Sequence, residues 1–284
     1  MRYLESIDLV GEIKEEQFFG AQRLTCYDSF HPFGLFPGKG LSHIEFSDIT
    51  IFYGGNGTGK STLLNVIASK IGAERRSFFN KSNFWDEYIE YCEVDYENRA
   101  VQNKRIITSD DVFDYMLDVR AMNQNIDNGR IERFSDFAEY RHKPFRFESL
   151  DQLDELRKIN MARSKSKSQY VRSTLTNNVR EYSNGESAFM YFSNNIRENG
   201  IYILDEPENS LSPEKQIELI KFLEDSSRFF HCQFIISTHS PFILSMRNAL
   251  IYDMDQVPVC QSKWTELKNV RMYYDFFKQH EDEF

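Results

Sequence analysis

Cysteine is scarce in this sequence, and none of the few present forms a C-x-x-C pair or stands at ligand spacing from a histidine. The four are Cys26, Cys92, Cys232 and Cys260. This spacing predicts neither a zinc site nor a disulfide framework. No apolar run approaches the roughly 18 residues that span a bilayer, and the start of the chain turns acidic before an apolar leader could form. We therefore expect a cytoplasmic protein with reduced thiols and no membrane insertion.

A surplus of positive charge is also absent. The chain has 34 basic and 44 acidic residues, which give a net charge of -10 and a pI near 5.2. Such a protein has no global basic field to attract nucleic acid or anionic membrane, so any contact of that kind must be local. Hydrophobic residues make up 40% of the 284 residues and aromatic residues 15%, which excludes a disordered chain. The length predicts one large domain or two small ones.

The first informative segment is a short apolar run, Asp48 to Tyr53, followed at once by glycines. Isoleucines and leucines then recur at helical spacing and stop at Gly72, so the segment reads as strand, glycine loop and helix. The loop fits the phosphate-loop pattern G-x-x-x-x-G-K-[ST], whose backbone N–H groups surround phosphate oxygens at a helix N-terminus. Its residues are Gly54, Gly55, Asn56, Gly57, Thr58, Gly59, Lys60, Ser61 and Thr62.

Two of these side chains have expected roles. Lys60 would neutralise the β and γ phosphates of a nucleotide, and the hydroxyl of Ser61 would ligate Mg²⁺. A simple glycine-rich turn is the alternative interpretation. The strand before the loop and the helix after it favour nucleotide binding.

Two further strands are predicted from Ile201 to Leu204 and from Gln233 to Ser237. Between them, Ser212 as N-cap and Pro213 at the first position open a helix, whose apolar side is expected to include Ile217, Ile220 and Leu223. Strands that alternate with helices predict parallel βαβ units, with ligands outside the carboxyl ends of the strands. The expected fold class is therefore α/β: a three-layer phosphate-loop domain with a mostly parallel central sheet.

Acidic residues and a histidine follow these strands. Asp205 stands where a carboxylate reaches Mg²⁺ in phosphate-loop enzymes, and Glu206 is placed to polarise an attacking water. Acidic residues that merely open a loop are the alternative. His239 follows the third strand and could donate a hydrogen bond to a γ-phosphate, although a single histidine is more often structural.

Residues 75 to 180 give weaker indications of structure and function. An acidic stretch runs from Trp85 to Glu97, and from Leu156 to Arg180 every charged residue is basic: Arg157, Lys158, Arg163, Lys165, Lys167, Arg172 and Arg180. The core of the basic stretch, from Arg163 to Ser168, reads as a mobile loop, and no heptad series predicts a coiled-coil arm. The segment Ser183-Asn184-Gly185-Glu186 has the form of a helix capping box, and such a helix start can also bind an anion.

The order of these motifs resembles that of ATP-binding-cassette (ABC) type ATPases. The phosphate loop is followed by Tyr182 to Ser187, then by Ile203 to Glu208, and then by Ser237 to Pro241. The chain is most similar to the small stand-alone "predicted ATPase", or AAA family ATPase, branch near the SMC, RecF and OLD ATPases. In that branch the signature also reads S-x-G-E-S, the Walker B run D-E-P-E-x-x-L-S-P, and the switch T-H-S-P.

The resemblance implies one ATPase domain over residues 1–284, with an insert and helical lobe at about 75–198 that carries the signature. It also implies a head-to-tail homodimer that sandwiches two ATP molecules. Residues 54–62 of one protomer would hold each nucleotide, and three residues of the other protomer would close over it: Ser183, Gly185 and Glu186. Glu206 would be the catalytic base and His239 the γ-phosphate sensor, while Asn209 to Ser212 would form the D-loop between the two sites.

Two expected parts are missing from the pattern. These ATPases usually place a glutamine ligand of Mg²⁺ between phosphate loop and signature. Asp110 is the candidate that replaces it, and Gln102 is a poorer one. Phe33 and Phe36 are candidates to stack on adenine, although core packing is the better account of both.

Three functions stay open. The leading hypothesis is an ATP hydrolase whose dimer opens and closes on DNA or an effector protein, in DNA maintenance or phage defence. The basic stretch would then contact DNA, unless it is simply a solvated loop. A slow nucleotide sensor that controls a toxin or nuclease partner is the second hypothesis. The nucleotide-binding subunit of a transporter is the third, although its signature would more often read L-S-G-G-Q.

Overall fold

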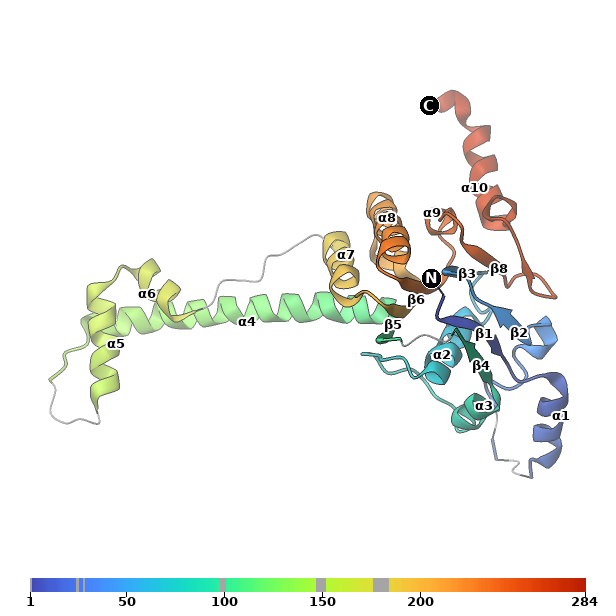
Figure 1. Cartoon of the computed structure of the whole chain (residues 1–284). Helices are drawn as coiled ribbons and strands as arrows, with labels where there is room; N and C mark the ends of the chain where they lie inside the picture. The colour runs from blue at the N-terminus through green and yellow to red at the C-terminus, as the bar shows by residue number, and fades with distance from the viewer. Residues whose placement is uncertain (1, 24–25, 28, 98–100, 147–151, 176–183) are drawn as a thin grey trace. The chain divides into compact units, whose positions relative to one another are not determined.

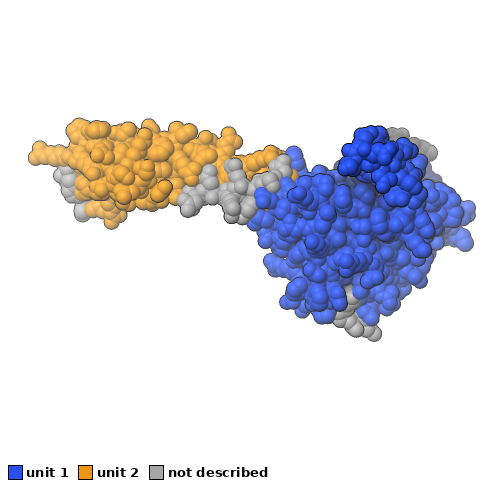
Figure 2. Space-filling view, turned by 90° about the horizontal axis from the view of Figure 1, so that it is seen from above, with its two compact units in different colours: residues 1–113, 184–284 blue, residues 114–183 orange. Residues whose placement is uncertain are grey.

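The computed structural model describes residues 2–23, 26–27, 29–97, 101–146, 152–175 and 184–284. The chain forms two compact units, which Figure 1 shows as ribbons and Figure 2 in two colours. Unit 1 comprises residues 1–113 and 184–284, and unit 2 comprises residues 114–183. The insert predicted at about 75–198 is wider than unit 2, since its first and last parts belong to unit 1.

The elements follow one another with strands and helices interleaved. The strands are β1 (Leu4–Asp8), β2 (His43–Glu45), β3 (Ile49–Tyr53), β4 (Glu93–Tyr96), β5 (Asn103–Thr108), β6 (Gly200–Asp205), β7 (Cys232–Thr238), β8 (Leu250–Asp253) and β9 (Cys260–Gln261). The α-helices are α1 (Glu12–Ala21), α2 (Lys60–Ile71), α3 (Trp85–Tyr91), α4 (Ser109–His142), α5 (Leu153–Ser164), α6 (Lys167–Thr174), α7 (Asn184–Asn195), α8 (Pro213–Phe229), α9 (Pro241–Leu244) and α10 (Lys268–Gln279). Short 3-10 helices are η1 (Pro37–Lys39), η3 (Pro207–Ser210), η4 (Trp264–Glu266) and η5 (Glu281–Glu283).

The large sheet of unit 1 has the strand order β5-β6-β7-β3-β8-β9. All neighbouring strands in it are parallel except β8 and β9. The strands β3, β6 and β7 are continuous apolar runs that are almost wholly buried, as expected for a parallel sheet covered on both faces. The predicted α/β class with a mostly parallel sheet is confirmed.

The register of the parallel strands brings three carboxyl ends together. Asp205 at the end of β6 pairs with Ser237 of β7, and Ser237 pairs with Phe52 of β3. The chain therefore leaves all three strands at the same edge of the sheet. This edge is where parallel α/β sheets bind their ligands.

Helix α2 lies between the large sheet and a smaller antiparallel one. It packs against β6 and β7 of the large sheet and against β4 of the small sheet, whose order is β2-β1-β4 (Figure 1). Its apolar side chains are buried on both sides, and the helix ends at Gly72, which adopts the left-handed conformation (φ 68°) that glycine tolerates. Helix α8 packs against β7, and α7 packs against α8.

The buried face of α8 differs from the prediction. Its N-cap is Ser212, whose hydroxyl accepts a hydrogen bond from the Lys215 N–H, as expected. Leu219 and Leu223 are buried, but Ile217 is 43% exposed. The apolar face follows the i, i+4 spacing of Leu219 and Leu223, and Ile217 lies out of phase with it.

The small and large sheets are joined by a buried glutamine. Gln233 on β7 accepts hydrogen bonds through Oε1 from the backbone N–H groups of Tyr3 (3.0 Å) and Leu4 (2.8 Å). Its Nε2 donates to the carbonyls of Leu4 (2.8 Å) and Ser47 (3.0 Å). All the hydrogen-bonding capacity that such a buried amide brings is therefore used.

We expect Gln233→Ala to lower the free energy of unfolding by about 3 kcal/mol, because it leaves buried backbone groups without partners and opens a cavity. Urea unfolding followed by circular dichroism would measure the loss. Gln261→Ala is the matched control, since Gln261 lies on β9 and is exposed. A loss below about 1 kcal/mol for Gln233→Ala would contradict the expected role.

Unit 2 contains most of α4, together with α5 and α6. Helix α4 has 34 residues, and its apolar side chains are spread around the helix instead of forming one stripe, so the sequence gives no clear helical period for it. Ion pairs three residues apart support it instead, such as Arg130 with Asp127 (2.6 Å) and Arg133 with Asp136 (2.8 Å). Among the described helices, none is long and apolar enough to cross a membrane.

The predicted loop from Arg163 to Ser168 is wrong. Helix α5 ends at Ser164, and α6 begins at Lys167. Ser166 and Gln169 form a capping box, in which the Ser166 hydroxyl accepts from the Gln169 N–H and the Gln169 side chain accepts from the Ser166 N–H. This reciprocal cap starts a new helix where serine-rich composition predicted a loop. The unit has a small hydrophobic core, which consists of Phe137, Ala162, Tyr170 and Val171.

Candidate active site

The phosphate loop joins β3 to α2 at the carboxyl edge of the large sheet. Gly57 (φ 80°) and Gly59 (φ 92°) adopt the left-handed conformation that the loop requires. Two side chains that the sequence analysis did not identify form hydrogen bonds with the backbone of the loop. Lys39 Nζ donates to the Thr58 carbonyl (2.7 Å), and the Gly55 N–H donates to Asp255 Oδ1 (2.8 Å).

Lys60 begins α2 and is only 4% exposed. Its ammonium group donates to the carbonyls of Gly54 (2.7 Å) and Gly55 (3.0 Å). It also lies 3.9 Å from Glu206 Oε1. The buried cation is therefore held between the loop and the acidic end of β6, where it can neutralise phosphate charge.

Asp205 and Ser61 meet at the same edge. The Ser61 hydroxyl donates to Asp205 Oδ1 (3.1 Å), and the Ser237 hydroxyl donates to the same oxygen. Burial raises the pKa of Asp205 above its ordinary value, while the two hydroxyl groups act in the opposite direction. A hydroxyl and a carboxylate are hard oxygen donors, so this pair fits Mg²⁺.

Metal binding by such a pair would rely on oxygen atoms from outside the protein. The described residues contain no group of three or more His, Cys, Asp or Glu side chains that could hold a metal ion. Mg²⁺ in nucleotide sites typically keeps few protein ligands and takes waters and phosphate oxygens for the rest. The donor set at Ser61 and Asp205 matches that mode.

Glu206 is held in an unusual backbone conformation. It follows β6 with φ 48° and ψ 57°, the left-handed region that non-glycine residues rarely adopt. Its N–H donates to the Ser237 carbonyl (3.1 Å), and its Oε2 accepts from Asn209 Nδ2 (3.0 Å). Its Oε1 faces both Lys60 and His239 Nδ1, which lies 3.7 Å away. Strain of this kind persists where the surroundings fix the side chain for a task.

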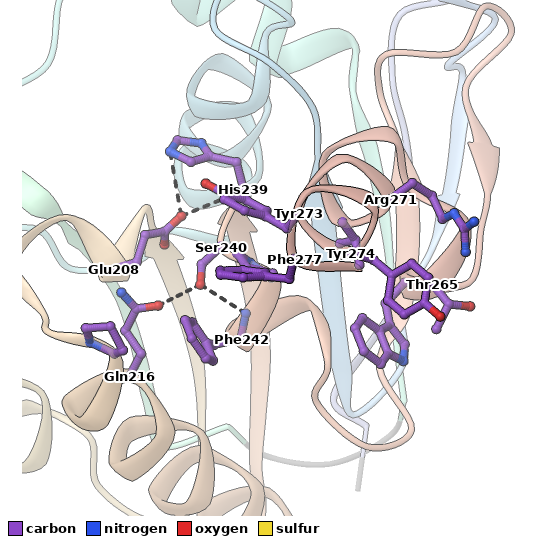
Figure 3. Close-up of a pocket in the computed structure, with 14 residues that line it drawn as sticks. Glu208, Gln216, His239, Ser240, Phe242, Thr265, Arg271, Tyr273, Tyr274 and Phe277 are labelled. Carbon is purple, nitrogen blue, oxygen red and sulfur yellow. Dashed lines mark hydrogen bonds and ion pairs between the residues drawn. The ribbon is translucent and has the colours of Figure 1, made fainter. Parts of the chain in front are cut away.

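His239 lies where β7 ends, and its ring is partly exposed. The ring faces Glu206. His239 also lines a cavity of about 830 Å³ between α8, α9 and α10 (Figure 3). The walls of the cavity include Glu208, Phe242 and the aromatic side chains of α10: Tyr273, Tyr274 and Phe277. The predicted grouping of Lys60, Ser61, Asp205, Glu206 and His239 is thus present in one place.

Comparison with known families identifies this arrangement. The family model described as "ABC transporter" matches residues 42–209, more than half of the chain. The chain belongs to the ABC family. A second family model, described as "AAA ATPase domain", matches residues 186–244. This ABC protein is therefore a nucleotide-binding ATPase, as its motifs predicted.

Solved structures similar to this ABC ATPase are distant. A nucleotide-free ATP-binding cassette from an ABC transporter is 17% identical, with 96% of this chain and 99% of that chain covered and a TM-score of 0.46. The SMC head domain from Thermotoga maritima is 16% identical, with 93% and 99% covered and a TM-score of 0.40. The Smc head domain with an extended coiled coil from Pyrococcus furiosus is 12% identical, with 97% and 100% covered and a TM-score of 0.41. No curated protein matches the sequence, so the assignment rests on the family models.

The signature segment of this ABC ATPase starts α7, but its predicted residues are only partly described. Ser183 lies outside the described residues. Gly185 lies against the start of α8, since a Cβ atom at Gly185 would stand 3.4 Å from Lys215 Cγ and 3.8 Å from the Ser212 nitrogen. The charge of Glu186 also acts on Lys215. The signature residues therefore lie beside the D-loop segment, Asn209 to Ser212.

The two candidates for the missing glutamine ligand of Mg²⁺ both lie at exposed positions. Asp110 is exposed on the first turn of α4, and Gln102 is exposed before β5. The neighbouring Asp111 is 1% exposed, and its carboxylate accepts hydrogen bonds from the N–H groups of Thr108 (2.8 Å) and Ser77 (2.9 Å). A metal role for Asp110 stays a prediction. Phe33 and Phe36 are both buried in the core, as the core-packing interpretation predicted.

Several residues near the site were not predicted from the sequence. His31 Nε2 lies 3.4 Å from the Thr62 hydroxyl at the helix side of the phosphate loop. Burial lowers the pKa of Arg75 below its ordinary value, and the charges of Asp111 and Asp205 oppose that shift. Arg75, Lys39 and Asp255 come from separate segments with no motif of their own, so only the fold brings them to this ATP site.

Proposed function

We propose that this chain is a Mg²⁺-dependent ATPase that works as an ATP-sandwiched, head-to-tail homodimer and switches a partner in DNA maintenance or phage defence. The observation that carries the proposal is the convergence of Lys60, Asp205, Glu206 and His239 at one edge of the sheet. A buried cation for phosphate, oxygen ligands for Mg²⁺ and a carboxylate for water are the parts that phosphoryl transfer needs.

Each residue has a role in this proposal. Lys60 and the loop N–H groups bind the β and γ phosphates, and Ser61 with Asp205 would hold Mg²⁺, which supplies charge neutralisation when bound. Glu206 takes a proton from the attacking water. His239 Nδ1 lies 3.7 Å from Glu206 Oε1, and the imidazole would donate a hydrogen bond to the γ-phosphate.

In the proposed dimer, signature residues from a second copy would complete the site. The signature residues Gly185 and Glu186 lie beside the D-loop and α8. A second copy in head-to-tail orientation would bring the start of its α7 over the nucleotide, where helix N–H groups favour an anion. Association would then depend on ATP.

The experiment that tests this proposal is the mass in solution of the wild type and of Glu206→Gln, each with and without Mg²⁺-ATP. We expect both to be monomers without nucleotide and Glu206→Gln to be a stable dimer with it, because hydrolysis no longer releases the trapped ATP. Gly185→Asp is the control, since an aspartate there would repel the phosphate and prevent closure. If ATP changes the mass of neither protein, the shared site is wrong for the isolated chain.

DNA is the proposed load because unit 2 presents a basic stretch. Arg157, Lys158, Arg163, Lys167 and Arg172 are exposed on α5 and α6, and Lys165 lies in the break between these helices. Several of these side chains have partners within unit 2: Arg157 pairs with Asp154 (3.4 Å), and the Lys167 ammonium lies 4.6 Å from the centre of the Phe134 ring. Exposed Lys and Arg side chains bind phosphate by counterion release.

Charge reversal of Lys165 and Lys167 together should lower DNA affinity by about tenfold and reduce the salt slope of binding by about 2. Fluorescence anisotropy of labelled duplex DNA at several salt concentrations would measure both quantities. Reversal of Lys14 and Lys221, which are exposed on unit 1, is the matched control. Unchanged affinity and slope in the unit 2 variant would mean that this stretch does not contact DNA.

A further inference from the structure

The backbone of His239 is held by two side chains from distant parts of the chain. His239 follows the last residue of β7, so it lies beyond the paired part of the strand. Its N–H donates to Glu208 Oε1 (3.0 Å), and its carbonyl accepts from Asn269 Nδ2 (2.7 Å). The residue that carries the imidazole is therefore fixed on both sides, whichever rotamer the ring adopts.

Burial of the Glu208 carboxylate is energetically unfavourable for a residue with only a structural role. Its side chain is 7% exposed, and its Oε1 also accepts from the Thr238 hydroxyl (2.6 Å). Its Oε2 is buried and has no hydrogen-bond partner among the described residues. A buried carboxylate with one unpaired oxygen opposes folding, so a residue that only stabilised this loop would be better neutral. This position is therefore explained better by function than by stability.

The ring of His239 lies between two carboxylates. Its Nδ1 is 3.7 Å from Glu206 Oε1. Its Nε2 is 4.0 Å from Glu208 Oε1, which Figure 3 shows. Glu208 Oε1 therefore lies near both ends of the residue, since it accepts a hydrogen bond from the backbone N–H and lies 4.0 Å from the ring.

The second anchor links His239 to the phosphate loop. Asn269 stands at the start of α10, and its backbone N–H donates to the Tyr53 hydroxyl (3.0 Å). Tyr53 is the last residue of β3, directly before Gly54. One asparagine thus joins the histidine segment to the strand that leads into the loop.

We propose that Glu208 is a positioning residue that holds His239 beside Glu206, with Asn269 as the second anchor. This inference rests on the proposed function, because it matters only if His239 takes part in hydrolysis. It concerns residues that bind no part of the nucleotide and act through His239.

The test combines steady-state ATP hydrolysis with double variants. Glu208→Ala should lower kcat about 30-fold while the Kd for ATP stays within about twofold, because ground-state binding is retained and the placement of His239 is lost. Glu208→Gln keeps an acceptor oxygen and should stay within about fivefold of the wild type. In the His239→Ala background, Glu208→Ala should cause no further loss, since residues that act as a unit are not additive.

A second readout does not depend on hydrolysis. Hydrogen exchange of the backbone around residue 239, measured without nucleotide, should be faster in Glu208→Ala than in the wild type. Glu224→Ala is the matched control, because Glu224 also accepts a backbone hydrogen bond, from the Arg247 N–H (2.8 Å), but away from His239. Asn269→Ala leaves the buried carboxylate in place and should lower kcat about fivefold, which keeps the test open if Glu208→Ala does not fold.

Each outcome separates this inference from the proposed function. The inference is overturned if Glu208→Ala hydrolyses ATP like the wild type, if its loss multiplies with that of His239→Ala, or if Glu208→Gln is as impaired as Glu208→Ala. If His239→Ala retains full turnover and Glu206→Gln does not, the roles of His239 and Glu208 fall together and the rest of the proposed function stands. If Glu206→Gln also retains full turnover, the proposed function itself is wrong.

Discussion

Glu206→Gln should lower the rate of phosphate release about a thousandfold, while ATP affinity changes by less than about threefold. The amide has the size of the carboxylate and keeps an oxygen within reach of Asn209 Nδ2, which lies 3.0 Å from Glu206 Oε2. It cannot take a proton from water, so the chemical step fails and binding does not. Single-turnover phosphate release with excess enzyme, together with equilibrium binding of a fluorescent ATP analogue, would separate the two quantities.

Glu214→Gln makes the same chemical change on the exposed first turn of α8, and it should leave both quantities unchanged. A loss below about tenfold in Glu206→Gln would assign the base to another group. Slow turnover in the wild type itself, with tight ATP binding, would instead favour a nucleotide sensor over a motor.

Lys60→Ala should weaken ATP binding about a hundredfold and lower turnover at least as much, because a buried ammonium group is removed from the phosphate site. The side chain is 4% exposed, and its ammonium group is directed at the loop carbonyls of Gly54 and Gly55. Lys70→Ala is the matched control within α2. Lys70 Nζ donates to the Ile89 carbonyl (3.0 Å) at the other end of the helix.

Mixing two inactive variants tests whether the site is shared. Lys60→Ala lacks a working phosphate loop, and Gly185→Asp lacks a working signature, so each alone should be inactive. In an equal mixture, mixed dimers contain one site in which both halves are intact, which should restore up to about a quarter of the wild-type activity. A mixture that stays inactive, with dimers present, would place the signature and loop of each site on the same chain.

Much of the site could be predicted because its parts are local patterns. The phosphate loop is contiguous, and Asp205 and His239 follow apolar runs that could only be buried parallel strands. Once three such strands are recognised, their carboxyl ends must meet at one edge of the sheet. The segments that form the proposed site could therefore be predicted from the sequence alone.

The supporting residues could not be predicted, because they join segments that are remote in sequence. Lys39 and Asp255 come from segments before and after the phosphate loop in the sequence, and Asn269 reaches His239 from the start of α10. None belongs to a spacing pattern. Glu208 was visible in the D-E-P-E run, but nothing in the sequence indicates that its carboxylate turns toward β7.

Unit 2 was hard to predict for a different reason. Helix α4 has no apolar stripe because much of its surface meets solvent, and its stability comes in part from ion pairs within the helix. The break between α5 and α6 depends on one serine and one glutamine. Composition alone could not tell this capped junction from a loop.

The way unit 2 is inserted bears on how such a protein can evolve. The strands on either side of the insertion, β5 and β6, pair with each other from Asn103 with Gly200 to Thr108 with Asp205. Their register fixes the flanks of the insertion regardless of what the chain does from residue 114 to residue 183. Descendants of this chain can therefore lengthen, shorten or exchange the part of that segment before the signature residue Ser183 while the pairing of β5 with β6 is kept.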